Sequence, residues 1–258
     1  DAALENQTIV LTSGQIEIVK AVTIDGPGAA KLAVSGNNDS RVFDISASGV
    51  VTLTAITVRD GNAVDVGGGI RNSGRLTLSA AAIVSNTAST YGGGIGSSGA
   101  GAVVTITAST IATNTAAYGG GGISTDNGSV VTVSGSTLTG NSISTAESVT
   151  SGGGAIFGAF GSSVTVNESN LTFNSASGAY GGGAIYSAGP LTITGSSFIS
   201  NTAALYGESE GQGGAVSFTG NNLYTVAISG TSFLSNTAYN RGGALYVASG
   251  TLDLDGGT

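Results

Sequence analysis

Short runs of alternating apolar and polar residues recur along the chain, each followed by a polar turn. In residues 191–194, for example, Leu191 and Ile193 alternate with Thr192 and Thr194. Alternation with a period of two predicts a β-strand with one buried and one exposed face. The last apolar residues of nine such strands are Ile24, Leu53, Leu78, Ile106, Val133, Val166, Ile193, Ile228 and Leu254. The pattern predicts an all-β chain built from nine similar units.

An asparagine follows most of these strands at a fixed distance. From the strand ending at Leu78 to the strand ending at Ile228, each last apolar residue lies eight positions before an asparagine. These asparagines are Asn86, Asn114, Asn141, Asn174, Asn201 and Asn236. The steps between them are 28, 27, 33, 27 and 35 residues, so all variation in length falls outside the eight-residue interval. One fixed arc and one variable arc are typical of a solenoid that accepts insertions at one corner.

A glycine block ending in an apolar residue lies between each asparagine and the next alternating strand. The apolar residues are Ile70, Ile95, Ile123, Ile156, Ile185, Val216 and Leu245, and stacking predicts that they form one buried column. Each unit thus holds three short strand-like segments, which predicts a single parallel β-helix of about nine coils over residues 1–258. Residues 1–60 form less regular coils, and residues 61–258 carry the repeats. Because parallel crossovers are nearly always right-handed, we expect a right-handed helix.

The paired motifs indicate a family resemblance. "FISN" (198–201) and "FLSN" (233–236), together with "GGAI", "GGAV" and "GGAL", resemble the FxxN and GGA[ILV] repeats of the polymorphic membrane proteins. Those are surface β-helix passenger domains of autotransporter type. The chain also resembles secreted bacterial proteins with pectate-lyase-like β-helices. The resemblance covers about residues 60–250 and implies an exported surface protein, with adhesion as one role that the resemblance suggests.

Composition narrows the chemistry. Seven Lys and Arg against fifteen Asp and Glu give a net charge of −8, which disfavours a nucleic acid partner. The sequence has no Cys and no His, which excludes thiol and imidazole chemistry. No apolar run approaches the roughly 20 residues that span a bilayer, so no transmembrane segment is predicted. The chain begins at Asp1 without Met, which suggests a removed export segment or a piece of a longer protein.

Two motifs look chemical but lack their context. "GIGSSG" (Gly94–Gly99) matches a dinucleotide fingerprint, yet a Val- and Thr-rich strand follows instead of a helix. "GESEG" (Gly207–Gly211) matches a nucleophile elbow, but no histidine is present to act as the base. Beyond residue 75 the only basic residue is Arg241, and most acids there are single. We therefore expect no catalytic residues, no metal and no cofactor, with a polysaccharide-cleaving enzyme as an alternative.

Candidate binding residues lie at the variable corner. Five tyrosines fall between an asparagine and its glycine block: Tyr91, Tyr118, Tyr180, Tyr206 and Tyr239. Two long insertions, residues 142–151 and 202–211, share this corner and add Glu147, Glu208 and Glu210. Insertions on one edge of a solenoid often form its binding face. Aromatic rows bind sugars, but they also cover glycine-lined corners.

The asparagines themselves allow two interpretations. They could form a row of ligands, or a structural ladder in which each amide bonds to the copies above and below. We favour the ladder, because asparagine tolerates the left-handed turn conformation that such corners require.

The exposed residues of the alternating strands form a third candidate surface. They are mostly Thr and Ser, in pairs such as Thr105 with Thr107 and Thr192 with Thr194. These ranks resemble those of ice-binding β-solenoids, which makes ice binding a further alternative, although Thr is a common exposed strand residue.

The sequence as a whole predicts an extracellular structural or adhesive rod on a bacterial cell surface, without catalysis. Its partners would be other copies of itself, end to end or lateral, or cell-surface and carbohydrate ligands. Because the chain stops partway through a coil, at "LDLDGGT", a self-assembling filament is an alternative.

Overall fold

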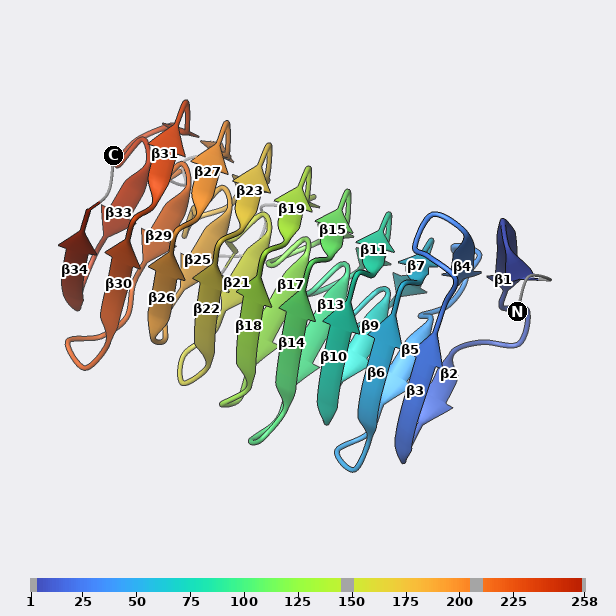
Figure 1. The fold of residues 1–258 in the computed structure, drawn as a ribbon. Helices are drawn as coiled ribbons and strands as arrows, with labels where there is room; N and C mark the ends of the chain where they lie inside the picture. Colours follow the sequence, from blue (N-terminus) through green and yellow to red (C-terminus); the bar gives the residue numbers. More distant parts are fainter. Residues whose placement is uncertain (1–3, 145–150, 205–210, 257–258) are drawn as a thin grey trace.

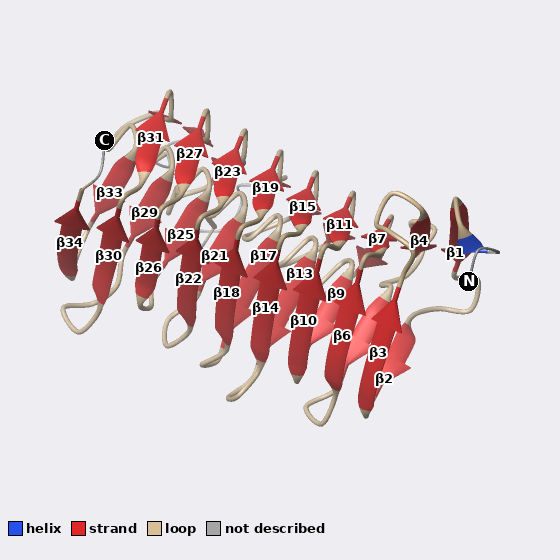
Figure 2. Ribbon diagram, in the orientation of Figure 1, coloured by secondary structure: helices blue, strands red, loops and turns tan. Residues whose placement is uncertain are grey.

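The computed structural model describes residues 4–144, 151–204 and 211–256. Parallel strands stack in nine coils along one axis, with the N- and C-termini at opposite ends of the stack (Figure 1). All pairings between neighbouring coils are parallel (Figure 2). Three sheets take one strand from each of the nine coils, and a fourth sheet takes one strand from each coil from the third onward. This confirms the predicted parallel β-helix of about nine coils.

Four sheets line the coil, numbered here in the order in which the chain visits them. Sheet 1 contains β1 (Gln7–Val10), β4 (Leu32–Ser35), β7 (Thr57–Arg59), β11 (Ala82–Val84), β15 (Thr110–Ala112), β19 (Thr137–Thr139), β23 (Asn170–Thr172), β27 (Ser197–Ile199) and β31 (Ser232–Leu234). Sheet 2 contains β8 (Asn62–Ala63), β12 (Thr87–Ala88), β16 (Thr115–Ala116), β20 (Ser142–Ile143), β24 (Ser175–Ser177), β28 (Thr202–Ala204) and β32 (Thr237–Ala238).

The glycine block leads into sheet 3, and the alternating strands form sheet 4. Sheet 3 contains β2 (Ile16–Ile18), β5 (Phe43–Ile45), β9 (Ile70–Asn72), β13 (Ile95–Ser98), β17 (Ile123–Asp126), β21 (Ile156–Gly158), β25 (Ile185–Ser187), β29 (Val216–Phe218) and β33 (Leu245–Val247). Sheet 4 contains β3 (Ala21–Asp25), β6 (Val50–Thr54), β10 (Arg75–Ser79), β14 (Val103–Thr107), β18 (Val130–Ser134), β22 (Ser163–Asn167), β26 (Leu191–Thr194), β30 (Thr225–Ser229) and β34 (Thr251–Asp255).

Sheet 2 corrects the prediction of three strands per coil. The first two coils have three strands each, but every coil from β7 onward has a fourth. Most sheet 2 strands are two residues long and bury a single small side chain, such as Ala88 or Ala116. So short a strand cannot show an alternating pattern, and it lies directly beside the asparagine turn. From the sequence alone, this segment was therefore interpreted as part of the loop.

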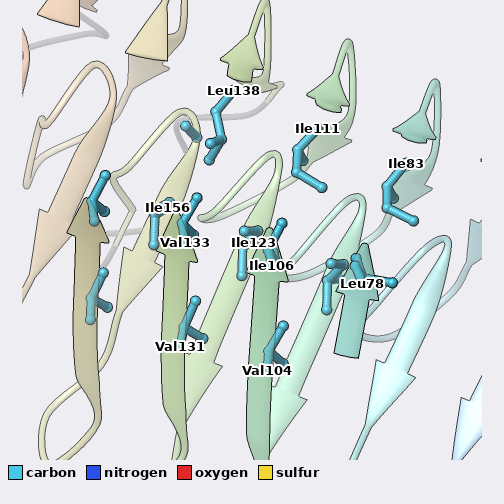
Figure 3. Packing of buried hydrophobic residues seen from close by; sticks show 14 of the residues in the cluster. Leu78, Ile83, Val104, Ile106, Ile111, Ile123, Val131, Val133, Leu138 and Ile156 are labelled. Atoms are coloured by element: carbon cyan, nitrogen blue, oxygen red, sulfur yellow. The ribbon is translucent and has the colours of Figure 1, made fainter. Parts of the chain in front are cut away.

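The register of sheet 4 agrees with the sequence prediction residue by residue. The last apolar residues pair in one row through all nine coils, for example Leu78 with Ile106 and Ile106 with Val133. The predicted column of sheet 3 also forms: the residues from Ile70 to Val216 are fully buried, and Leu245 is half-buried. Figure 3 shows part of this cluster, in which Ile106 of sheet 4, Ile123 of sheet 3 and Ile111 of sheet 1 point into the interior between the sheets. The core is one continuous apolar column along the axis.

Two corners explain why the eight-residue interval is constant. From the strand ending at Leu53 onward, the residue two positions after the last apolar strand residue takes a left-handed conformation, as at Ala108 (φ 48°) and Gly135 (φ 53°). A second left-handed residue comes just before the asparagine, as at Thr113 (φ 53°) and Gly140 (φ 61°). Each corner is thus closed by a single residue. An added residue would turn the sheet 1 strand over, because side chains alternate between faces.

Candidate functional site

The six asparagines form a continuous hydrogen-bonded ladder at the corner between sheets 1 and 2. Each Nδ2 donates to Oδ1 of the asparagine in the next coil, at 2.9–3.0 Å from Asn86 to Asn236. The same Oδ1 accepts the backbone N–H of the asparagine before it. Asn114, Asn141, Asn174 and Asn201 have no exposed surface, and Asn86 has almost none. With their amides buried and satisfied, these side chains act as structural links and offer no ligand row.

The reason given for the ladder from the sequence was wrong in one respect. The left-handed residue is the one before the asparagine: Ser85, Thr113, Gly140, Phe173, Ser200 and Ser235 have φ between 53° and 61°. None of the six asparagines is itself left-handed. In the coil before Asn86, the equivalent position is Gly61, whose N–H donates to Asn86 Oδ1 at 2.8 Å.

A second ladder, of hydroxyl groups, lies at the corner between sheets 4 and 1. Ser136 Oγ accepts the backbone N–H of Ser109 at 3.1 Å and donates to the carbonyl of Ser134 at 2.8 Å. The same pattern holds for Ser109, Ser169, Ser196 and Thr231. Sequence reasoning missed this ladder. Its signal was present, because each hydroxyl residue lies three positions after the last apolar residue of its strand.

Three of the predicted tyrosines come together outside sheet 3. The rings of Tyr91 and Tyr118 lie 5.8 Å apart, and Tyr91 lies 5.2 Å from Phe157. Phe157 stacks on Tyr186 at 5.2 Å, and Tyr186 stacks on Tyr180 at 4.9 Å. Phe157 and Tyr186, which the sequence did not single out, are the buried centre of this aromatic row.

The row packs against the glycine corner. A Cβ on Gly119 would lie 2.8 Å from the Phe157 ring, and a Cβ on Gly152 would lie 3.2 Å from the Cβ of Tyr186. Burial raises the pKa of Tyr186 to about 12, although its hydroxyl is 2.6 Å from Thr219 Oγ1. Much of the row therefore covers glycine backbone, as one of the two sequence interpretations proposed.

Of the other predicted binding residues, the structure describes only Tyr239, which does not join this row. Tyr239 is 66% exposed in the ninth coil. Tyr206, Glu147, Glu208 and Glu210 lie outside the described residues.

A hollow of about 370 Å³ opens beside the aromatic row. Tyr91 and Phe157 line one side, and Ser98, Ser124 and Asp126 contribute polar groups. Its floor is formed by β13, β17 and β21. The "GIGSSG" segment supplies Gly96, Ser97 and Ser98 to this floor as a strand, so it is no dinucleotide loop.

An ion-pair network fixes the loop on the N-terminal side of the hollow. The buried Arg41 donates to the carbonyls of Val66 and Gly67 at 3.0 and 2.9 Å, and also pairs with Asp65. Burial lowers the pKa of Arg41. The hydrogen bond between Arg71 and Asp44 raises the pKa of Arg71. Both guanidinium groups remain charged, and they hold Val66 against the hollow.

The exposed face of sheet 4 is a regular hydroxyl array. One row pairs Thr23, Thr52, Thr77, Thr105, Thr132, Thr165 and Thr192 in register. The next row contains Thr54, Ser79, Thr107, Ser134, Asn167, Thr194 and Ser229.

Comparison with known proteins gives one family match. Residues 230–248 match the Chlamydia polymorphic membrane protein repeat. This segment contains both "FLSN" and "GGAL", so the match confirms the resemblance derived from those motifs. No curated protein and no solved structure matches the chain. The described part of the chain contains no group of three or more Asp, Glu, His or Cys placed to hold a metal ion. It also contains no helix with the length and apolar character needed to cross a bilayer.

Proposed function

We propose that this chain is a stiff, non-catalytic rod displayed on a bacterial cell surface, with a structural or adhesive role. The observation that carries the proposal is the place of the matched repeat in the fold. Its asparagine is a rung of the ladder, and its glycines form the corner before sheet 3. The same two features recur in register through the preceding coils. The repeat is therefore the building unit of the described structure from about residue 61 onward.

The geometry suits a spacer. Nine coils at about 4.8 Å per step make a rod of roughly 38 Å. Three sheets connect every coil to the next, and from the third coil onward the fourth sheet and the two ladders add further links. Because neighbouring coils are joined through three or four sheets, bending requires many hydrogen bonds to break together. A rod of this kind would hold its variable corner away from the cell, where a ligand can reach it.

Surface display and adhesion are tested separately. Antibodies against the purified chain should label intact cells that produce the protein, and protease treatment of those cells should remove the signal. Beads coated with the chain should bind to target cells, and free chain should compete with them. Labelling that appears only after cell lysis would overturn surface display. Beads that bind no better than albumin-coated beads would overturn adhesion.

The other interpretations have their own readouts. Electron microscopy of the purified chain distinguishes fibres, which would support the filament, from separate rods. Release of reducing ends or unsaturated products from polygalacturonate would show a polysaccharide-cleaving enzyme and contradict the non-catalytic proposal.

The hydroxyl array of sheet 4 supports a second candidate function, binding to ice. Seven threonines in register form a flat row with one methyl and one hydroxyl per coil. Thermal hysteresis of the purified chain, abolished in Thr105→Lys and Thr132→Lys, would support this function. A wild-type freezing curve equal to that of albumin would exclude it.

A further inference from the structure

We propose that the hollow beside Tyr91 and Phe157 is a binding site for a neutral hexopyranose glycan. This inference rests on the proposed adhesive function and names the ligand class that one surface of the rod would take. The hollow lies on the outer side of sheet 3, over β13, β17 and β21. Its volume of about 370 Å³ is within the usual range of small-ligand sites.

The hollow exists because two coils lack large side chains at one outward position. In register along sheet 3, this position is occupied by Arg71, Gly96, Ser124, Phe157 and Tyr186. Ser124 is small, and Gly96 lets the backbone of Val66 and Gly67 pack directly on β13, so no large side chain stands between that loop and the aromatic rings. A Cβ on Gly96 would lie 2.8 Å from the backbone nitrogen of Gly67, so only glycine fits there. The low floor is therefore a built feature of these coils.

The C-terminal wall of the gap is aromatic. The rings of Tyr91 and Phe157 lie 5.2 Å apart at an angle of 41°, and both line the hollow. Phe157 is held from behind by Tyr186, which stacks on it with an interplanar angle of 20°. Rigid aromatic rings offer an apolar surface for the C–H faces of a pyranose, with the tyrosine hydroxyl as a polar edge. Rings that are already packed lose little conformational entropy when a ligand binds.

Hydrogen-bonding groups line another part of the hollow. Ser98 and Asp126 are paired neighbours on β13 and β17, one coil apart. Asn127 holds both, because its N–H donates to Asp126 Oδ1 at 2.7 Å and its Nδ2 donates to Ser98 Oγ at 3.0 Å. The carboxylate keeps free acceptor sites, since two oxygens provide about four lone pairs. A sugar that stacks on the rings could donate its hydroxyl protons to Asp126.

The surrounding charge selects a neutral ligand. A second hollow of about 570 Å³ shares Val66 and Ser98 with the first and contains Glu17, Asp44 and Arg71. Arg71 is already paired with Asp44 and Asp65. The two hollows together run from β2 to β21, about 24 Å at the spacing of stacked strands, which exceeds one sugar unit. With Asp126 they present more carboxylates than guanidinium groups, so an acidic polysaccharide would be repelled.

Binding is tested by titration calorimetry with defined probes. We expect the chain to bind at least one of cellohexaose, maltohexaose and mannohexaose with a Kd below about 1 mM, and polygalacturonate at least about tenfold more weakly. Ser98→Leu places a branched apolar side chain in the hollow and should weaken binding at least about tenfold. Its matched control, Ser134→Leu on the outer face of sheet 4, should bind like the wild type.

Two further variants separate the contributions of the wall and the carboxylate. Tyr91→Ala should weaken binding about fivefold or more, whereas Tyr239→Ala in the ninth coil should not change it. Asp126→Asn keeps the turn acceptor and should reduce the discrimination against polygalacturonate. Thermal melts of all variants identify any change that comes from unfolding.

Three results would overturn the inference. They are no saturable binding of the neutral probes, binding that survives Ser98→Leu, and polygalacturonate binding as tight as that of the neutral probes. A chain that labels intact cells and adheres to them, yet shows any of these results, would refute the glycan site and leave the proposed surface function standing.

Discussion

Replacing Asn174 with alanine is expected to destabilise the β-helix by several kcal/mol. The side chain makes four hydrogen bonds in the middle of the ladder. Its Nδ2 donates to Asn201 Oδ1 and to the carbonyl of Leu138, both at 3.0 Å. Its Oδ1 accepts the N–H and the Nδ2 of Asn141, also at 3.0 Å. All three asparagines are fully buried, so water cannot replace these partners.

The magnitude follows from these bonds. A buried hydrogen bond contributes about 1 kcal/mol, so four bonds give about 4 kcal/mol. The unpaired N–H of Asn141 adds to this, because a buried donor without a partner costs about 1–3 kcal/mol. For a chain of this size, about 4 kcal/mol corresponds to a decrease in Tm of roughly 8–16 °C.

The measurement is a thermal melt followed by circular dichroism, with Asn167→Ala as the control. Asn167 lies on the outer face of β22, half-buried, and its replacement should change stability by about 0.5 kcal/mol or less. Hydrogen exchange adds a local test, because the amide of Asn141 should lose protection in Asn174→Ala. Similar melting temperatures for the two variants would refute the ladder as a stabilising element.

Other predictions concern the corners and the buried tyrosine. Gly182→Ala should destabilise by about 3 kcal/mol in urea unfolding, because its Cβ would lie 2.2 Å from the Ile185 carbonyl oxygen. Gly135→Ala, with a similar positive φ but open space, should cost about 1 kcal/mol. Ser136→Ala should cost about 2 kcal/mol, since it removes the acceptor of the Ser109 N–H, and Ser134→Ala should cost almost nothing. The pKa of Tyr186 is raised from 10.0 to about 12, so below pH 10 the tyrosine is neutral in both states. Between pH 10 and 12 the unfolded chain ionises first and stability falls by up to about 3 kcal/mol. In Tyr186→Phe, the urea midpoint should fall less between pH 10 and 12 than in the wild type. The same pH profile in both proteins would contradict the raised pKa of Tyr186.

The sequence predicted the repeating frame in detail because alternation and spacing are local signals. The row from Ile24 to Leu254 pairs in the register expected from the strand ends. The buried column at the start of sheet 3 was likewise predicted from the glycine blocks. Such positions repeat from coil to coil, so the strand assigned in one coil can be checked against the same strand in the others.

Features that do not repeat were harder to predict. Along one outward row of sheet 3, two residues are small (Gly96 and Ser124) and two are large (Phe157 and Tyr186). Only the stacking of the coils shows that these residues lie in the same row. Tyr91 was among the binding residues predicted from the sequence, but Asp126 and Ser98 were not. A single sequence gives no sign of which irregular side chains face one another across coils, because their separation of about 28 residues varies with the insertions.

The two edges of the coil therefore have different constraints. The arc from sheet 4 to sheet 2 is closed by two left-handed residues, a hydroxyl ladder and an asparagine ladder. One added residue there would turn the side chains of a strand to the opposite faces of the sheet. The glycine corner accepts segments of different length, since the steps between the asparagines vary only outside the eight-residue interval. Beyond the glycines, the surface of this second edge can therefore change without breaking either ladder. The hollow of Tyr91, Phe157 and Asp126 lies on this second edge. Substitutions of its exposed members, such as Asp126, should alter recognition while the ladders keep the rod intact.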